Sequence, residues 1–172
     1  FLSNPDKTQY PSSAQMINDK GILYVLGDSE PYTGTIIDYH PNGVKSYKVE
    51  VKQGVPQGTA TEWYKSGQKM TETTLENGQV TDAIKGWYPS GKQEYEMPIK
   101  NGEISGVGIE FYESGAKKSG TSYVNGLRNG RELGYADAKV KQKLWEANWR
   151  DDKLHGSYIE FYISGKTNSL TP

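Results

Sequence analysis

The sequence predicts an all-β protein, an elongated, curled antiparallel meander of repeated 24-residue β-hairpins. Two series of glycines recur with this spacing, and apolar and polar residues alternate between them. The first series follows short aromatic segments at Gly43, Gly67, Gly91 and Gly115, and the second lies at Gly54, Gly78, Gly102 and Gly126. A fixed period of this size indicates a repeat architecture.

Composition narrows the classes of protein that fit the 172 residues. The formal net charge is −1, which argues against broad electrostatic binding to nucleic acid. The sequence has no apolar run long enough to predict a membrane span. The absence of Cys excludes disulfides, thiol catalysis and Cys-ligated metal sites. Because 13 Tyr and 4 Trp replace much of the usual aliphatic content, we expect a thin, aromatic core.

The N-terminal part does not follow the repeat. Residues 1–13 are mostly polar, contain two prolines and have no period, so they predict a flexible tail. Residues 14–33 contain the turn Asp19-Lys20-Gly21 and the apolar run ILYVLG, which predict a capping hairpin. Because the chain starts at Phe1 and not at Met, we expect that an upstream segment has been removed.

Residues 34–168 are predicted to form one repeat domain of about six units, each with two antiparallel strands. In VKSYKVEVKQG, the side chains of Tyr47, Val49 and Val51 share one side, and the charged residues between them share the other. Asn-Gly pairs between such segments predict type I′ turns, which need positive φ at both central residues. A lone hairpin is marginal in water, so stacking of neighbouring units must stabilise the domain.

The register of each hairpin has two alternatives. A four-residue loop after the aromatic pair places Tyr64 on the same side as Leu75, whereas a three-residue loop places Trp63 there. In either case, one ring of each pair points away from the main apolar row. The fifth unit departs from the period, and we expect about three extra residues in its loop, around Ala136 to Lys143.

The aromatic pairs are the candidate partner-binding residues. They recur near one edge of the predicted sheet, roughly 10 Å apart. Such a row could bind an extended peptide, stack against sugar rings or dock a partner chain, and packing within the core is the alternative. The candidates are Trp63, Tyr64, Trp87, Tyr88, Phe111, Tyr112, Phe161 and Tyr162.

No residue pattern predicts catalysis, and no cofactor or metal is predicted. The only histidines, His40 and His155, fall in separate turn segments. Carboxylate pairs such as Glu62 and Glu72 are expected on a charged sheet face without any function. The glycines lack the context of a phosphate-binding loop, so turns explain their spacing. The chain is therefore predicted not to be an enzyme.

Several segments resemble the bacterial MORN-repeat variant and look like proteins of the YwqK-type antitoxin family. The resemblance runs from about residue 16 to residue 168. It implies a MORN-like repeat sheet that serves as an interaction module, and its antitoxin label implies a toxin partner. The segments that carry it are Tyr32-Thr33-Gly34, Asp38-Tyr39-His40-Pro41-Asn42-Gly43, Trp63-Tyr64-Lys65-Ser66-Gly67, Phe111-Tyr112-Glu113-Ser114-Gly115 and Lys153-Leu154-His155-Gly156.

The sequence therefore predicts a non-enzymatic repeat scaffold that binds a protein partner through an aromatic-rich sheet face. An envelope glycan-binding module and antitoxin-like neutralisation of a toxin are the alternatives, and a homodimer is left open. We expect the protein to be exported, either to the periplasm or cell envelope or as a secreted lipoprotein. A cytoplasmic location is also left open.

Overall fold

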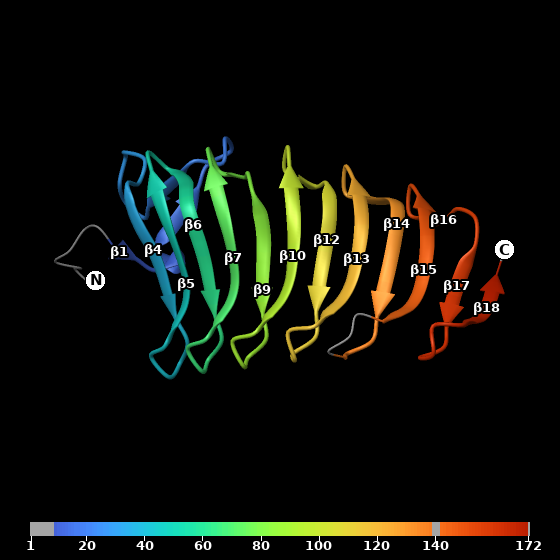
Figure 1. Cartoon of the computed structure of the whole chain (residues 1–172). Helices are drawn as coiled ribbons and strands as arrows, with labels where there is room; N and C mark the ends of the chain where they lie inside the picture. Colours follow the sequence, from blue (N-terminus) through green and yellow to red (C-terminus); the bar gives the residue numbers. More distant parts are fainter. Residues whose placement is uncertain (1–8, 139–141, 172) are drawn as a thin grey trace. The chain divides into compact units, whose positions relative to one another are not determined.

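The computed structural model describes residues 9–138 and 142–171, and its contacts divide the chain into two compact units. Unit 1 comprises Phe1–Thr81 and unit 2 comprises Asp82–Pro172, so the division falls inside the predicted repeat domain 34–168. The described part contains many strands, one short 3₁₀ helix and no α-helix. The predicted fold class, an all-β meander of antiparallel hairpins, is confirmed (Figure 1).

Unit 1 contains a meander and a separate two-stranded hairpin. In the meander, the strands follow the order β1, β4, β5, β6, β7, and β8 pairs with β7. All of these pairs are antiparallel except the parallel pair β1–β4. The elements are β1 (Gln9–Tyr10), η1 (Ser12–Ala14), β2 (Gln15–Ile17), β3 (Leu23–Val25), β4 (Gly34–Tyr39), β5 (Lys45–Lys52), β6 (Val55–Trp63), β7 (Lys69–Glu76) and β8 (Gln79–Val80).

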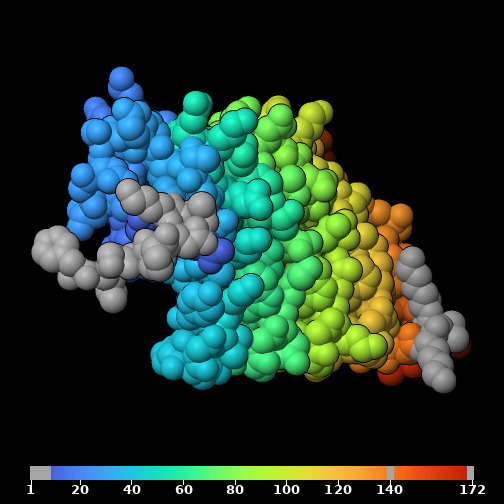
Figure 2. Space-filling view, turned by 90° about the vertical axis from the view of Figure 1, so that its left-hand side faces the viewer, coloured from blue at the N-terminus to red at the C-terminus, as the bar shows by residue number. Residues whose placement is uncertain are grey.

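The hairpin β2–β3 covers one face of the unit 1 meander. Its Leu23 and Val25 belong to the same buried cluster as Val49 and Val51 of β5, which are only 1% and 2% exposed. The main chain adds a bond, because the Leu23 N–H donates to the Gly54 carbonyl at 2.9 Å. Figure 2 shows the blue N-terminal segment beside the light-blue and cyan strands of unit 1. The core of unit 1 therefore lies between two layers.

The predicted N-terminal tail, residues 1–13, lies only partly within the described residues. Residues 1–8 are outside them. Gln9 and Tyr10 form β1, which pairs with Thr35 and Ile36. The Tyr10 ring also packs edge-on against Tyr32, with ring centroids 5.7 Å apart. The end of the predicted tail is thus part of the sheet in unit 1.

Unit 2 is a meander in one layer, in the order β9, β10, β12, β13, β14, β15, β17, β18 (Figure 1). Every extensive contact between its strands is with a neighbour in the sheet. The short strands β11 and β16 extend β10 and β15. The strands are β9 (Ala83–Trp87), β10 (Gln93–Lys100), β11 (Glu103–Ile104), β12 (Gly106–Phe111), β13 (Lys117–Val124), β14 (Leu127–Tyr135), β15 (Lys143–Arg150), β16 (Lys153–Leu154), β17 (Tyr158–Phe161) and β18 (Thr167–Thr171).

Turn geometry explains both glycine series. In the Asn-Gly turns the central residues both have positive φ, for example 49° at Asn125 and 78° at Gly126, as predicted. The Gly126 N–H also donates to the carbonyl of Ile104 in the preceding hairpin at 2.8 Å. At the opposite end of the strands, Gly115 has a φ of 89° in the loop after the aromatic pair. These are conformations that glycine adopts at little cost.

A β-bulge determines which ring faces which side. Glu62 pairs with Thr71, but the next residue, Trp63, pairs with Lys69, so β7 has one extra residue there. Because side chains alternate along β6, Trp63 lies on the face opposite to Leu75. This is the facing that was expected from the four-residue loop.

The insertion in the fifth repeat is shorter than predicted. The Ala136 N–H donates to the Gln142 carbonyl, whereas in the preceding hairpin the Tyr112 N–H donates to Ala116. The closed loop is therefore two residues longer than its counterpart, not three. Residues 139–141, which contain part of the basic tip, lie outside the described residues.

The two faces of unit 2 carry different side chains, which alternate along each strand. We call them the glutamate face and the lysine face. The glutamate face carries Tyr95, Met97, Glu110, Tyr123, Glu132, Trp145, Ala147, Trp149, Tyr158 and Glu160. The lysine face carries Lys85, Glu96, Phe111, Lys117, Arg131, Leu133, Lys143 and Glu146.

Large side chains cover glycines of the adjacent strand on the glutamate face. A Cβ atom at Gly134 would overlap the indole of Trp145, and one at Gly86 would overlap the ring of Tyr95. A Cβ atom at Gly108 would lie 2.6 Å from the Met97 sulfur. The rings therefore bury backbone that a second layer would cover in a sandwich, as aromatic residues do beside glycines in other sheets.

We expect Gly134→Ala to lower the free energy of unfolding by roughly 1–3 kcal/mol, because the added methyl group displaces the Trp145 indole. Urea unfolding followed by tryptophan fluorescence measures this change. In a Trp145→Ala background the same substitution should cost much less, since the overlapping ring is gone. An equal cost in both backgrounds would show that ring packing is not the reason for glycine at this position.

Candidate functional site

The predicted candidate residues are divided between the units and have different surroundings. Trp63 and Tyr64 belong to unit 1, and the other six belong to unit 2. Each pair lies where the first strand of a hairpin ends. The first ring of a pair lies on the face opposite to Leu75 in unit 1 and on the lysine face in unit 2. The second ring follows at the start of the loop. The structure therefore gives the two positions different contacts.

The second residue of a pair ties neighbouring hairpins together. The Tyr88 hydroxyl donates to the Phe111 carbonyl at 2.8 Å, and the Tyr112 hydroxyl donates to the Tyr135 carbonyl at 2.9 Å. In unit 1, His40 occupies the equivalent position, and its Nε2 lies 2.7 Å from the Trp63 carbonyl oxygen. Burial, with a smaller contribution from Glu94, raises the pKa of Tyr88. These side chains connect one repeat to the next.

We expect Tyr112→Phe to lower the free energy of unfolding by about 0.5–1.5 kcal/mol, because it removes the hydrogen bond to the Tyr135 carbonyl. The matched control is Tyr162→Phe, at the corresponding position of a later repeat. Tyr162 is 54% exposed, and no acceptor for its hydroxyl lies within the described residues. Thermal unfolding compares the two variants, and equal effects would contradict a structural role for Tyr112.

Two rings on the lysine face, Tyr135 and Phe161, are each accompanied by a lysine of the chain itself. The Lys143 ammonium lies 4.8 Å from the centroid of the Phe161 ring, and the Lys117 ammonium lies 5.8 Å from that of Tyr135. Lys143 also pairs with Glu146 at 2.7 Å. Cations near ring faces at these distances stabilise the arrangement. On the lysine face, lysine ammonium groups of the chain therefore lie near aromatic rings of the same sheet.

Glu146 is held by two cations on this face. The Lys143 ammonium and the Arg131 guanidinium each lie 2.7 Å from its carboxylate. Their hydrogen bonds lower the pKa of Glu146, Lys143 contributing most. A lowered pKa in the folded state stabilises the fold above the ordinary value of 4.5, and this contribution disappears as the pH falls through the lowered value.

We expect Glu146→Gln to lower the free energy of unfolding at pH 7 by up to roughly 1 kcal/mol, since these pairs are partly exposed. As the pH falls below 4.5 and through the lowered pKa of Glu146, the difference from the wild type should shrink, because Glu146 itself becomes protonated. Urea midpoints measured across this range test the pattern. A difference that is constant with pH would refute the ion-pair explanation.

The glutamate face contains a repeated row that crosses the strands. In strand register, Gly86 pairs with Tyr95, Tyr95 with Glu110, and Glu110 with Ser119. The same order recurs four strands further along, where Gly134 pairs with Trp145, Trp145 with Glu160, and Glu160 with Ser169. The row of side chains therefore repeats after two hairpins, not after one.

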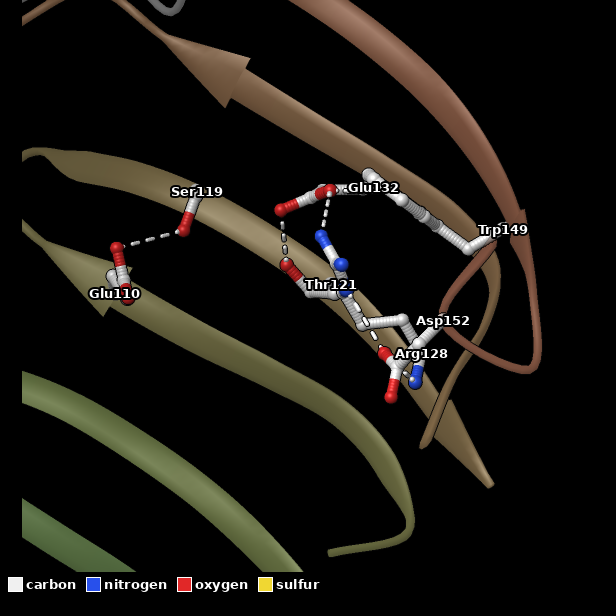
Figure 3. Close-up of polar contacts among 7 residues, drawn as sticks. All are labelled: Glu110, Ser119, Thr121, Arg128, Glu132, Trp149 and Asp152. Carbon is white, nitrogen blue, oxygen red and sulfur yellow. Dashed lines mark hydrogen bonds and ion pairs between the residues drawn. The ribbon is translucent and has the colours of Figure 1, made fainter. Parts of the chain in front are cut away.

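A second polar group lies beside this row (Figure 3). Glu132, whose side chain is 16% exposed, accepts hydrogen bonds from the Thr121 hydroxyl at 3.1 Å and from the Trp149 indole at 2.5 Å. The Arg128 guanidinium lies 3.5 Å from the centroid of the Trp149 ring and donates to Asp152 at 3.0 Å. These contacts hold Trp149 and Arg128 in fixed positions on the glutamate face.

The row and this polar group border a cavity of about 190 Å³. Glu110, Tyr123, Glu132 and Trp145 contribute to its lining. Burial is the main reason for a raised pKa at Tyr123, followed by the charge of Glu132. Lys118 also lines the cavity, 3.4 Å from Glu110. Because two carboxylates face one ammonium there, a hollow of this kind can hold a group that is both flat and cationic.

The sequence did not point to these residues as a binding surface. None of Tyr95, Tyr123, Glu132, Trp145 and Trp149 was among the residues predicted to bind a partner. The pattern becomes visible when every second hairpin is compared. Glu62, Glu110 and Glu160 then occupy equivalent strand positions.

No group of three His, Cys, Asp or Glu side chains in residues 9–138 and 142–171 is arranged to hold a metal ion. In the same ranges, no helix has the length and apolarity needed to cross a membrane. Comparison with known proteins adds no assignment, because no family model matches the chain and no curated protein matches it.

Proposed function

We propose that the chain is a non-enzymatic repeat scaffold that binds a protein partner through the glutamate face of unit 2. The proposal keeps the class of function expected from the sequence and moves the contact to a different set of rings. The MORN-like family assignment and export to the cell envelope remain parts of the proposal that rest on the resemblance.

The observation that carries the proposal is that the chain covers this sheet face in unit 1 but, among the described residues, makes no comparable contacts over the equivalent face of unit 2. In unit 1, the face with Val49 and Val51 is covered by Leu23 and Val25 of the chain's own hairpin. In unit 2, the corresponding face belongs to a sheet whose extensive strand contacts are all with sheet neighbours. A protein segment bound there would cover the second face as β2–β3 covers the first.

The chemistry of the glutamate face also favours protein binding. It offers large aromatic rings, which are enriched at the energetic centres of protein interfaces. Trp145 and Tyr158 lie with ring centroids 6.1 Å apart and planes 24° apart, so they present a broad aromatic surface. Tyr88 and Tyr112, in contrast, use their hydroxyls within the fold. Interfaces benefit from rings that are already fixed before binding.

Charge reversal on the two faces provides a matched test. Glu110 lies on the glutamate face and Glu96 on the lysine face, and both side chains are 42% exposed. Each lies near a lysine, so Glu110→Lys and Glu96→Lys should perturb the fold similarly. We expect a specific partner, recovered from cell-envelope extract and then purified, to bind Glu110→Lys at least about tenfold more weakly, and Glu96→Lys unchanged.

Binding that is equally weakened by both variants, or retained by both, would exclude the glutamate face as the contact surface. A glycan array probed with the wild type, Glu110→Lys and Glu96→Lys distinguishes the glycan-binding alternative from protein binding. Glycan binding that is lost only in Glu110→Lys would favour that alternative. Identification of the purified partner as a toxin would instead support the antitoxin alternative.

A further inference from the structure

We propose that the segment bound to the glutamate face is an extended, basic chain that crosses the strands and presents arginines to two equivalent subsites. The subsites are Tyr95 with Glu110 and Trp145 with Glu160. This inference rests on the proposed function and specifies the chemistry of the partner.

The two subsites share a ring over a glycine and a glutamate opposite that ring. They differ in the neighbours of the glutamate, which are Lys118 at Glu110 and the Tyr158 hydroxyl at Glu160. In each, the ring lies over a glycine of the preceding strand, Gly86 in one and Gly134 in the other. The next strand places a glutamate directly opposite the ring. A ring that lies across the sheet beside a carboxylate presents its face and an acceptor to the same ligand group.

Serine hydroxyls orient both carboxylates. Ser119 donates to Glu110 at 3.2 Å, and Ser169 donates to Glu160 at 2.9 Å. In Glu110, the hydroxyl and the Lys118 ammonium, at 3.4 Å, both contact Oε2. Within the described residues, Oε1 of Glu110 has no such partner. The carboxylate is therefore held in place and keeps one oxygen for a ligand.

The chain itself contains the interaction that we assign to the partner. On the same face, the Arg128 guanidinium lies 3.5 Å from the centroid of the Trp149 ring and contacts Asp152 at 3.0 Å. A guanidinium is planar, stacks on aromatic rings and forms directional hydrogen bonds with carboxylates. The ring and carboxylate of each subsite can receive an arginine of a partner in the same way.

The charges of the face favour a basic ligand. Glu110, Glu132 and Glu160 lie on it, and the cations beside them are Lys118 and Arg128. Since Arg128 also pairs with Asp152, the face has an excess of negative charge. Complementary charge increases the rate of association and disfavours acidic competitors.

The spacing of the subsites sets the spacing of the arginines. Tyr95 and Trp145 are four strands apart, on β10 and β15. With neighbouring strands about 4.8 Å apart, the subsites lie roughly 19 Å apart. An extended peptide advances about 3.3 Å per residue, so this distance corresponds to about six residues. Residues i and i+6 of an extended chain also point to the same side, as simultaneous binding requires.

A peptide series tests this spacing. Fluorescent peptides of Ser and Thr carry two arginines separated by four, five, six, seven or eight positions, and fluorescence anisotropy measures their affinity for the full chain. We expect the six-position peptide to bind best, about tenfold tighter than the five- and seven-position peptides, because only it reaches both subsites at once. Replacing its arginines by lysines should weaken binding.

Conservative variants connect the spacing to the subsites. Glu110→Gln and Glu160→Gln should each abolish the preference for six positions, whereas Glu96→Gln, on the lysine face, should leave it intact. Affinity that does not depend on spacing would indicate nonspecific charge attraction and would overturn the inference. Binding by none of the peptides would also overturn it.

These outcomes are separable from a failure of the proposed function. If no peptide binds but the purified partner still distinguishes Glu110→Lys from Glu96→Lys, the scaffold proposal stands and only the basic segment is wrong. Sedimentation of the wild type and Glu110→Lys covers the second-copy alternative. Self-association that requires Glu110 would mean that another copy of the chain occupies the face, and the inference would fail.

Discussion

The packing of rings on glycines is the interaction on which unit 2 depends. A single-layer sheet has no second layer to bury its apolar side chains, so burial must occur within the sheet itself. Trp145 over Gly134 and Tyr95 over Gly86 provide it by covering the backbone of the neighbouring strand. Ala147, which pairs with Glu132 and lies between Trp145 and Trp149 on the same face of β15, is completely buried within this layer. The rings therefore serve both as core and as surface.

The rings on the two faces of unit 2 lie beside different charged groups. On the lysine face, rings such as Phe161 have cations of the chain beside them, and Glu146 joins two of these cations. On the glutamate face, carboxylates lie beside rings. Arg128, which stacks on Trp149, shows how a cation can bind to a ring on this face. Phe161 has the Lys143 ammonium near its ring, whereas the strand neighbour of Trp145 is the carboxylate of Glu160. This difference is the reason for placing the proposed ligand on the glutamate face.

The fold was predictable because its signals are local. Glycine spacing and Asn-Gly turns depend on φ at single residues, such as Asn125, and alternation along a strand depends only on pleating. The facing of Trp63 was left open because it depends on a bulge, which inserts a residue into one strand and leaves no mark in the period. The glutamate face was missed because its pattern joins residues across strands, with a repeat of two hairpins. The hydroxyl bond from Tyr112 to the next repeat likewise cannot be read from a single unit.

The alternation between hairpins limits how such a chain can change in length. Gain or loss of one hairpin would preserve turns and strand pairing, but it would place a hairpin with Glu opposite Ser or Thr where a hairpin with Gly opposite an aromatic residue is needed. Glu62 with Thr71 and Glu110 with Ser119 show the first type, and Gly134 with Trp145 shows the second. Only insertions or deletions of whole pairs keep the two types in order. Relatives of different length should therefore differ by steps of four strands.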